Sequence, residues 1–271
     1  MRIIRFLDAA GSVCLGRDLG GGRAQRLTGD LFGGLKDTGE VVQVQRLLAP
    51  VAPPNIFCIG LNYREHAKES GSPIPENPVV FMKPTTALNH PGQPIRLPRS
   101  CTHGPEVDYE VELAAVIGRT CRDVPPEQAL DCVLGYTVAN DVSARKWQRN
   151  NGGQWVRGKG FDTFCPLGPC LVTPGNGAQE IADPQSLRLR TLLNGQVMQD
   201  SCTSDMIFSV AQIISFLSRD NTLLPGTVIL TGTPPGVGFA RKPPVYLKPG
   251  DQLMLEIEGI GSLSNPVESA A

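Results

Sequence analysis

Three acidic residues in two short segments give the strongest chemical signal in the sequence. Glu110 and Glu112 stand one residue apart in an otherwise apolar run, and Asp141 follows a second apolar run. Side chains alternate between the two faces of a β-strand, so Glu110 and Glu112 would point the same way. Two neighbouring carboxylates repel each other and are costly to bury unless a cation lies between them. An all-oxygen ligand set favours Mg2+, Mn2+ or Ca2+ over zinc.

Each of these acidic residues also has an ordinary explanation. Glu110 and Glu112 could form a solvated face, since glutamate is common at protein surfaces. The apolar sequence that follows the pair favours an interior strand instead. Asp141 by itself could be a helix N-cap, although active-site groups also often lie at strand ends.

A histidine and a glutamate form a second candidate pair. His66 and Glu69 are three residues apart in a segment that predicts a helix, and residues at this spacing are neighbours on a helix surface. A carboxylate can fix the tautomer of an imidazole and make it a better general base. The alternative is a surface contact that contributes little. We expect His90 and His103, which stand among prolines and glycines, to be loop residues.

Two glycine-rich segments hold the remaining candidates. Lys159 lies between glycines, and its charge would suit a carboxylate or an enolate, although it could also be a solvated lysine. Gln154 and Thr163 lie in the same stretch and are weaker candidates for substrate binding. Thr233 follows an apolar strand, and its Gly- and Pro-rich loop could present N–H groups and a hydroxyl to an anion. The spacing in that loop does not match a dinucleotide-binding fingerprint.

The elements that must position these residues are expected to be mostly strands, because 30 glycines and 24 prolines disfavour long helices. The alternation of apolar residues and the turn signals predict the following strands: Arg2–Leu7, Ser12–Leu15, Glu40–Leu48, Ile56–Ile59, Val107–Ile117, Tyr136–Ala139, Thr227–Leu230 and Gln252–Glu258. Helices are expected at Asn62–Ser70 with Asn62 as N-cap, at Pro126–Val133, and at Ser204–Ser218 with Ser204 or Asp205 as N-cap.

The proline-rich segment 49–54 predicts a linker between a small N-terminal β-rich module, residues 1–52, and a larger domain, residues 53–271. A chain of 271 residues is long enough for both. The net charge of −1 and the pI near 6.3 argue against a nucleic-acid partner. No apolar run approaches the roughly 18 residues that cross a bilayer, and charges interrupt the N-terminus where a signal peptide would be apolar.

The eight cysteines are scattered and form no C-x-x-C pair, which argues against a zinc ribbon or a thioredoxin-type site. Unpaired cysteines of this kind are usually small core residues in a reducing compartment. We therefore expect the cytoplasm, or a mitochondrial matrix form without its presequence.

Five motifs, in order, resemble the fumarylacetoacetate hydrolase family, and in particular its domain-containing proteins. The resemblance covers residues 53–267 and is carried by residues 59–63, 110–113, 140–145, 158–169 and 231–238. Residues 1–50 resemble a small N-terminal module of many bacterial members. The resemblance implies a mainly β fold with some α, a mixed β-roll, usually assembled as a homodimer. It also implies that Glu110, Glu112 and Asp141 bind Mg2+ or Mn2+.

The resemblance also assigns roles to the other candidates. In acylpyruvate-cleaving relatives a His and a Glu in the position of His66 and Glu69 activate water, and a lysine in the position of Lys159 lies beside substrate oxygens. Fumarylacetoacetase itself has a further metal-binding Asp just before its histidine motif. The corresponding stretch here, residues 58–61, holds no carboxylate, which argues against fumarylacetoacetate as the substrate.

We therefore expect a metal-dependent enzyme that acts on small 2-oxo carboxylates, which can chelate the ion and form an enolate. The first expectation is C–C bond hydrolysis of an acylpyruvate-like compound. Keto–enol tautomerisation or decarboxylation of oxaloacetate, and isomerisation of a 2-hydroxymuconate-type compound, are the alternatives. A metal-binding scaffold without activity is a further alternative, but it would have no need of His66, Glu69 and Lys159.

Overall fold

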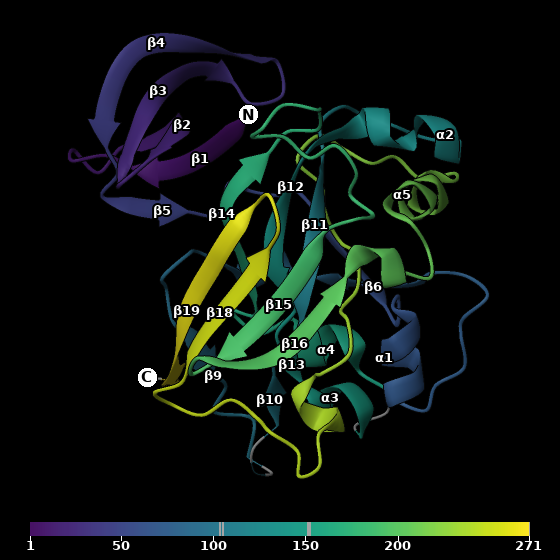
Figure 1. Ribbon diagram of the computed structural model, residues 1–271. Helices are drawn as coiled ribbons and strands as arrows, with labels where there is room; N and C mark the ends of the chain where they lie inside the picture. The colour runs from purple at the N-terminus through teal and green to yellow at the C-terminus, as the bar shows by residue number, and fades with distance from the viewer. Residues whose placement is uncertain (103, 105, 151–152, 271) are drawn as a thin grey trace.

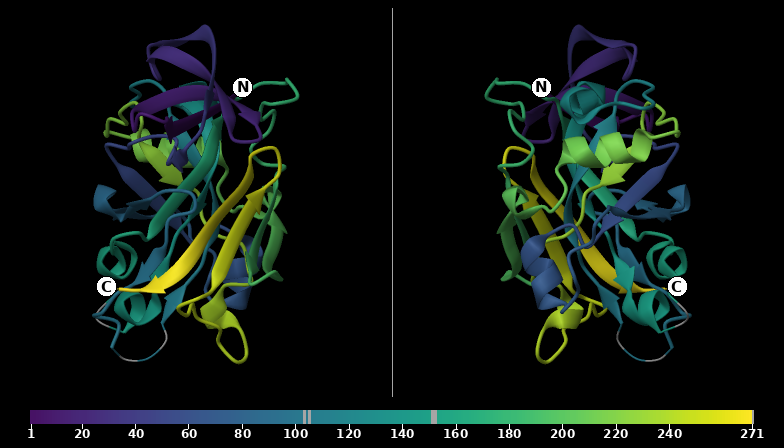
Figure 2. Two further views of the ribbon diagram at one scale, coloured as in Figure 1. Left: turned by 90° about the vertical axis from the view of Figure 1, so that its left-hand side faces the viewer. Right: turned by 90° about the vertical axis from the view of Figure 1, so that its right-hand side faces the viewer.

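The computed structural model describes all residues except 103, 105, 151–152 and 271, so His103 lies outside the described residues. The fold consists of two β-sheets that pack face to face, with short helices around their ends (Figure 1). Figure 2 shows the two layers edge-on, with the C-terminal strands in one layer and strands from the middle of the chain in the other. The expected mainly β fold with some α is confirmed.

The larger sheet has 12 strands and continues from the N-terminal segment into the rest of the chain. Its order is β4-β3-β2-β1-β14-β12-β11-β17-β6-β7, with β5 paired to β1 and β8 paired to β14. The strands are β1 Arg2–Leu7, β2 Val13–Gly20, β3 Arg23–Asp30, β4 Gly34–Gln43, β5 Arg46–Leu48, β6 Ile56–Gly60, β7 Val79–Lys83, β8 Leu88–Asn89, β11 Val111–Ile117, β12 Val133–Asn140, β14 Cys165–Val172 and β17 Val228–Leu230.

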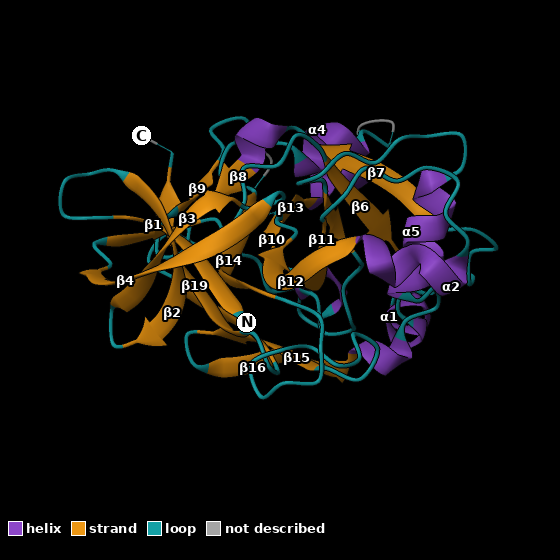
Figure 3. Ribbon diagram, turned by 90° about the horizontal axis from the view of Figure 1, so that it is seen from above, coloured by secondary structure: helices purple, strands orange, loops and turns teal. Residues whose placement is uncertain are grey.

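The second sheet has five strands in the order β16-β15-β18-β19-β9, and β10 and β13 form a separate pair. These strands are β9 Ile95–Leu97, β10 Val107–Asp108, β13 Ser143–Ala144, β15 Arg188–Leu193, β16 Gln196–Cys202, β18 Gln252–Ile257 and β19 Gly261–Ser269. Figure 3 shows from above that the helices gather on one side of the molecule. They are α1 Arg64–Glu69, α2 Pro126–Ala129, α3 Arg145–Arg149, α4 Trp155–Lys159 and α5 Val210–Ser218. Among the described residues, no helix is both long and apolar enough to span a membrane.

Strand β11 is buried on both faces, which explains its nearly continuous apolar sequence. Val111, Leu113 and the following odd-numbered residues belong to the main hydrophobic core. Ala114 and Val116 pack in a second core cluster on the opposite face. Glu112 is two residues before Ala114, so its side chain lies on the same face as Ala114 and Val116. The alternation of the strand therefore directs its carboxylate away from the main core.

The N-terminal strands are joined to the rest of the molecule by hydrogen bonding of β1 to β14, with Arg2 opposite Val172 and Ile3 opposite Leu171. The proline-rich segment after β5 is packed rather than free, since Ala49 and Val51 are buried. The division of the chain at residue 52 stays a prediction.

The predicted strand Val107–Ile117 is wrong as a single element. Residues Val107–Asp108 pair with β13, whereas Val111–Ile117 pair with β12 and β17. The chain changes partners between these two strands, at Tyr109 and Glu110. Likewise, the predicted strand Glu40–Leu48 is divided between β4 and β5.

Two predicted helix starts are also wrong. The helix expected from Ser204 begins at Val210 and is capped by Ser209, whose side chain forms a capping box with Gln212. Asp205 instead accepts a hydrogen bond from the N–H of Glu65. Helix α1 begins after Tyr63. The predicted cap, Asn62, uses its amide to bind the carbonyls of Phe208 and Thr231.

His90 connects the segment after β5 to the loop between β8 and β9 and should make stability depend on pH. The N–H of Ala49 donates to His90 Nδ1 at 3.1 Å, and burial, followed by the charges of Arg5 and Arg46, lowers the pKa of His90. The unfolded chain, in which histidine has a pKa of about 6.5, then binds a proton more readily than the folded protein. This contribution to stability is complete above the unfolded pKa and is lost as pH falls through the lower folded value.

We expect His90→Asn, which keeps an acceptor but cannot titrate, to reduce the loss of stability on acidification. The measurement is urea unfolding of both proteins at about pH 8 and about pH 5.5. An equal loss in the two proteins would contradict this role of His90.

Candidate metal and substrate site

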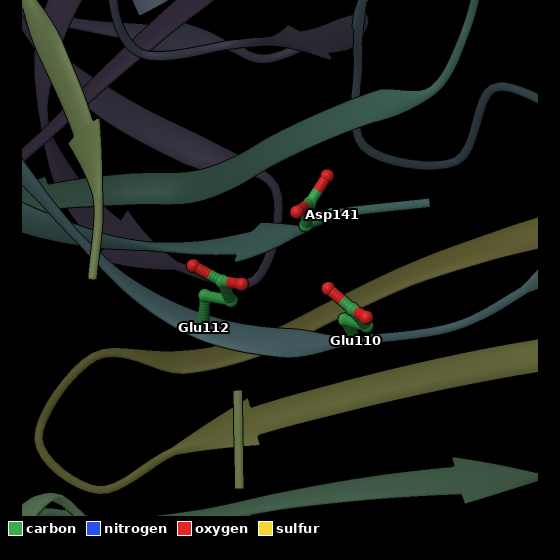
Figure 4. Close-up of side chains that lie close together, drawn as sticks. All are labelled: Glu110, Glu112 and Asp141. Atoms are coloured by element: carbon green, nitrogen blue, oxygen red, sulfur yellow. The ribbon is translucent and has the colours of Figure 1, made fainter. Parts of the chain in front are cut away.

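The three predicted metal ligands converge in the structure. Carboxylate oxygens of Glu110, Glu112 and Asp141 lie within 4.8 Å of one another (Figure 4). The three residues are buried, with exposed fractions of 4%, 1% and 1%. They come from two neighbouring segments of the larger sheet, around the start of β11 and the end of β12.

Hydrogen bonds donated by two backbone N–H groups fix these segments against each other. The N–H of Glu110 donates to Asn140 Oδ1 at 3.0 Å, and the N–H of Asp141 donates to the carbonyl of Glu110 at 2.9 Å. Glu110 lies in the gap between β10 and β11, and Glu112 lies in β11 itself. The two glutamates therefore converge although only one of them is in a regular strand.

Buried cations neutralise two of the three carboxylates. Lys159 Nζ lies 2.8 Å from Glu110 Oε2 and 2.5 Å from Asp141 Oδ2. Arg145 Nη2 lies 2.6 Å from Glu110 Oε1 and 2.8 Å from Asp108 Oδ2. Lys83 Nζ lies 2.7 Å from Asp141 Oδ1.

The pKa values follow from burial and from these charges. Burial alone would raise the pKa of Glu110, but the charges of Lys159 and Arg145 hold it well below its usual value. Burial would lower the pKa of Lys159, but Asp141 and Glu110 keep it above the usual value. For Glu112, burial and then the charges of Asp141 and Glu110 raise the pKa well above its usual value.

Glu112 is the carboxylate that lacks a compensating charge. Its Oε2 accepts the N–H of Gly232 at 2.7 Å, and no basic side chain of the described residues lies within ion-pair distance. Gly232 adopts φ +102°, and a Cβ there would lie 2.6 Å from the Cβ of Asn62, so only glycine fits. A buried carboxylate without a cation, beside two others, is a suitable environment for a hard divalent cation with oxygen ligands.

The predicted contact between His66 and Glu69 is present. His66 Nδ1 lies 3.1 Å from Glu69 Oε2, and the second oxygen of Glu69 accepts the N–H of Gly236 at 2.9 Å. Gly236 has φ +100°, and a Cβ there would lie 2.2 Å from the carbonyl oxygen of Met198. With Nδ1 turned to Glu69, Nε2 of His66 is the nitrogen left for chemistry.

The carboxylates, Lys159 and His66 line one cavity of about 190 Å3. This is smaller than the roughly 300–1,000 Å3 of pockets for drug-sized ligands and suits a small substrate. The other lining residues are Ile59, Gly60, Leu61, Ser70, Ser72, Val79, Phe81, Arg145, Gln148, Arg149, Trp155 and Thr233.

The three predicted substrate-binding residues lie at different places in the structure, and only Thr233 lines this cavity. Thr233 lines the cavity, but its hydroxyl donates to the carbonyl of Val111 and accepts from Gln199. Gln154 is exposed at the start of α4 and is not among the cavity-lining residues. Thr163 lines a different surface pocket, where its hydroxyl accepts the N–H of Arg96.

Sequence reasoning did not select several residues that complete the site. Arg145, Gln148 and Arg149 all line the cavity from α3, and their spacing of three and four residues on one helix face could have indicated this. Lys83 ends the apolar run of β7, where a lysine needs a buried partner.

Two substitutions should distinguish the carboxylate without a cationic partner, Glu112, from one that has such partners, Glu110. Glu112→Gln replaces a buried carboxyl group that has no cationic partner and whose pKa is raised, so the metal-free variant should be at least as stable as the wild type. Glu110→Gln leaves Lys159 and Arg145 with a neutral partner and should cost about 3–5 kcal/mol. Thermal unfolding with and without Mg2+ or Mn2+ tests this, and both variants should lose the stabilisation by metal.

The exposed Glu127→Gln is the matched control and should behave as wild type. A Glu112→Gln variant that retained full stabilisation by metal would contradict the assignment of Glu112 as a ligand.

Known proteins match both the sequence and the fold. Residues 55–268 match the family model described as Fumarylacetoacetate (FAA) hydrolase C-terminal, and residues 1–50 match Rv2993c-like, N-terminal. "Oxaloacetate tautomerase fahd2, mitochondrial" of Xenopus laevis is 50% identical over 82% of this chain and 68% of its own length. "2,4-didehydro-3-deoxy-L-rhamnonate hydrolase" of Sphingomonas is 51% identical over 76% and 70%.

A solved structure, "2-hydroxyhepta-2,4-diene-1,7-dioate isomerase" from Mycobacterium marinum, is 42% identical with a TM-score of 0.84 over 100% of this chain and 99% of its own. These similarities confirm the resemblance drawn from the five motifs. The two family models cover the same parts of the chain, residues 55–268 and 1–50, as the resemblance does. The chain belongs to the fumarylacetoacetate hydrolase family of enzymes.

Proposed function

We propose that this enzyme catalyses keto–enol tautomerisation of a small 2-oxo dicarboxylate, with oxaloacetate as the candidate substrate. The observation that carries the proposal is the cavity that brings His66 together with the carboxylate cluster and Lys159. A cavity of about 190 Å3 suits a four-carbon acid. The name of the Xenopus laevis relative, at 50% identity, supports oxaloacetate in particular.

Glu110, Glu112 and Asp141 would hold the metal, with Mg2+ or Mn2+ as the proposed ion because all donors are carboxylate oxygens. When bound, such an ion supplies Lewis acidity at the 2-oxo carboxylate end of the substrate. Lys159 places a fixed positive charge beside Glu110 and Asp141, where negative charge on the 2-oxo oxygen would develop.

His66 is the proposed base. Its Nε2 would accept a proton from the carbon next to the 2-oxo group. The electron pair of that C–H bond would form the new C=C bond, and the π pair of the C=O bond would move onto the 2-oxo oxygen. Protonation of that oxygen completes the enol, and the reverse sequence returns the ketone. Glu69 keeps the ring in the tautomer with Nδ1–H, and the N–H of Gly236 keeps Glu69 in place.

Hydrolysis of an acylpyruvate-like compound, the first expectation from the sequence, is the second candidate. The His66–Glu69 pair favours it, because an oriented imidazole can also activate water. The Sphingomonas relative is named as a hydrolase. Release of pyruvate from acetylpyruvate would identify this reaction, whereas tautomerisation changes only the enol absorbance.

The first test is the rate at which enol absorbance of oxaloacetate relaxes with Mg2+ and enzyme. We expect acceleration by the wild type, a loss of about 100-fold or more in His66→Ala, and complete loss in Glu110→Ala. His90→Asn, at a histidine outside this cavity, should retain the wild-type rate. A near-normal rate in His66→Ala would contradict the role of His66 as base.

We also propose that a second copy of the chain covers the edge strand β7. This strand ends the larger sheet, and Val79, Val80 and Met82 are exposed by 38%, 39% and 37%. An apolar edge strand invites pairing unless something covers it. Cytoplasm or mitochondrial matrix remains the proposed compartment, supported by the burial of six of the eight cysteines.

Val80→Lys should therefore weaken self-association. Size-exclusion chromatography with light scattering should give a dimer for the wild type and mostly monomer for Val80→Lys at the same concentration. Val41→Lys, which changes an exposed valine of β4, is the control and should remain dimeric. A dimeric Val80→Lys would place the interface elsewhere.

A further inference from the structure

The cationic residues that line the cavity differ in what they bind. Lys159 contacts Glu110 and Asp141, and Arg145 contacts Asp108 and Glu110. Arg149 lines the same cavity, but no carboxylate of the described residues lies within ion-pair distance of it. Among the described residues, Arg149 is therefore the basic side chain lining this cavity that has no carboxylate in an ion pair with it.

The position of Arg149 is defined by an aromatic ring next to the proposed base. Its guanidinium carbon lies 3.9 Å from the centre of the Phe239 ring, and that of Arg145 lies 4.4 Å from the same ring. His66 packs edge-on against Phe239 with a centroid separation of 6.4 Å. Phe239 thus keeps Arg149 close to both Arg145 and His66.

Two guanidinium groups around one ring repel each other, and the carboxylates of Asp108 and Glu110, which pair with Arg145, offset only part of this repulsion for Arg149. Burial, and then the charge of Arg145, lowers the pKa of Arg149. Arginine nonetheless remains charged in proteins, and its planar group binds carboxylates through two parallel hydrogen bonds. A carboxylate entering the cavity beside Arg149 would relieve this repulsion.

Other residues that line the cavity are apolar, in contrast to these charged side chains. Ile59, Val79, Phe81 and Trp155 line it with apolar surface, which would suit an uncharged acyl group. A substrate whose reactive end is held at the carboxylate cluster could direct its other end either to this wall or to Arg149.

We propose that Arg149 binds the distal carboxylate of a 2-oxo dicarboxylate and so selects dicarboxylates over monocarboxylates. The proposal rests on the proposed function for the location of the reactive end. A site with an unpaired charge rejects an analogue that lacks the complementary group, because the charge then stays uncompensated.

The kinetic test uses Arg149→Gln, with Arg149→Lys as the conservative variant. For oxaloacetate we expect KM to rise about 10- to 100-fold in Arg149→Gln, as for loss of a hydrogen bond to a charged group, with kcat little changed. Arg149→Lys should recover part of the loss. Enolisation of the monocarboxylate acetylpyruvate should be unaffected.

Arg157→Gln is the matched control. Arg157 also stacks on aromatic rings, at 4.4 Å from the centre of Phe161, but it lies outside this cavity. The Arg157→Gln variant should therefore have the same KM for oxaloacetate as the wild type.

A binding test without turnover separates this proposal from the proposed function. Malate and 2-hydroxybutyrate are four-carbon 2-hydroxy acids that differ in the distal carboxylate. Calorimetric titration of the Mg2+-loaded protein should show tighter binding of malate by the wild type, and equal binding of the two acids by Arg149→Gln. Binding of 2-hydroxybutyrate should be the same in both proteins.

Two results overturn the role of Arg149: equal binding of the two acids by the wild type, or a preference for malate that survives in Arg149→Gln. If the preference depends on Arg149 but oxaloacetate is not turned over, the assigned reaction is wrong and the role of Arg149 stands. If oxaloacetate is turned over but the preference is independent of Arg149, the reaction stands and this inference fails.

Discussion

The structure depends on the repulsion among carboxylates that are held close together out of water. Asp108, Glu110, Glu112 and Asp141 are buried side by side, and three buried cations compensate all of them except Glu112. The cations are themselves fixed: Lys83 also donates to the carbonyls of Val142, Lys159 and Phe164. Loss of one partner in such a network leaves a buried charge uncompensated, so its members depend on one another.

The β-sheets supply the rigidity that this arrangement needs. Strand β11 is buried on both faces, and β12 pairs with it along its length, so the carboxylates at their ends cannot move apart without breaking the sheet. The change of partner at Tyr109 and Glu110 lets a second carboxylate approach from outside the regular strand. The loop after β17 closes the site, because Gly232 brings a backbone N–H against Glu112 where a side chain would not fit.

Charge is divided between the inner and outer parts of the cavity. The inner cations bind carboxylates of the protein and hold the cluster together, whereas Arg149, near the surface, has no such partner among the described residues. His66 lines the same cavity, with its ring against Phe239 and its Nδ1 turned to Glu69. Among the described residues, Glu112 is thus the inner carboxylate without a cationic partner, and Arg149 is the outer cation without a carboxylate partner. The second of these is the basis of the selectivity inferred for Arg149.

The sequence by itself determined those features that depend on local periodicity. Alternation in a strand predicted that Glu110 and Glu112 share one side, and their carboxylates do converge, although Glu110 lies outside β11. The three-residue spacing on a helix brought Glu69 to His66, and the glycine and proline content indicated a mainly β fold. Only the tertiary structure decided the rest. The break in the strand at Glu110 comes from pairing with Ser143 and Ala144, and the ion pairs of Lys83 and Arg145 join segments far apart in the chain. Gln154 and Thr163 were predicted to act with Lys159 because they are near it in the sequence. In the structure Gln154 is exposed, and Thr163 accepts the N–H of Arg96 in another surface pocket. Long-range pairing and burial set these positions, and neither has a local pattern in the sequence.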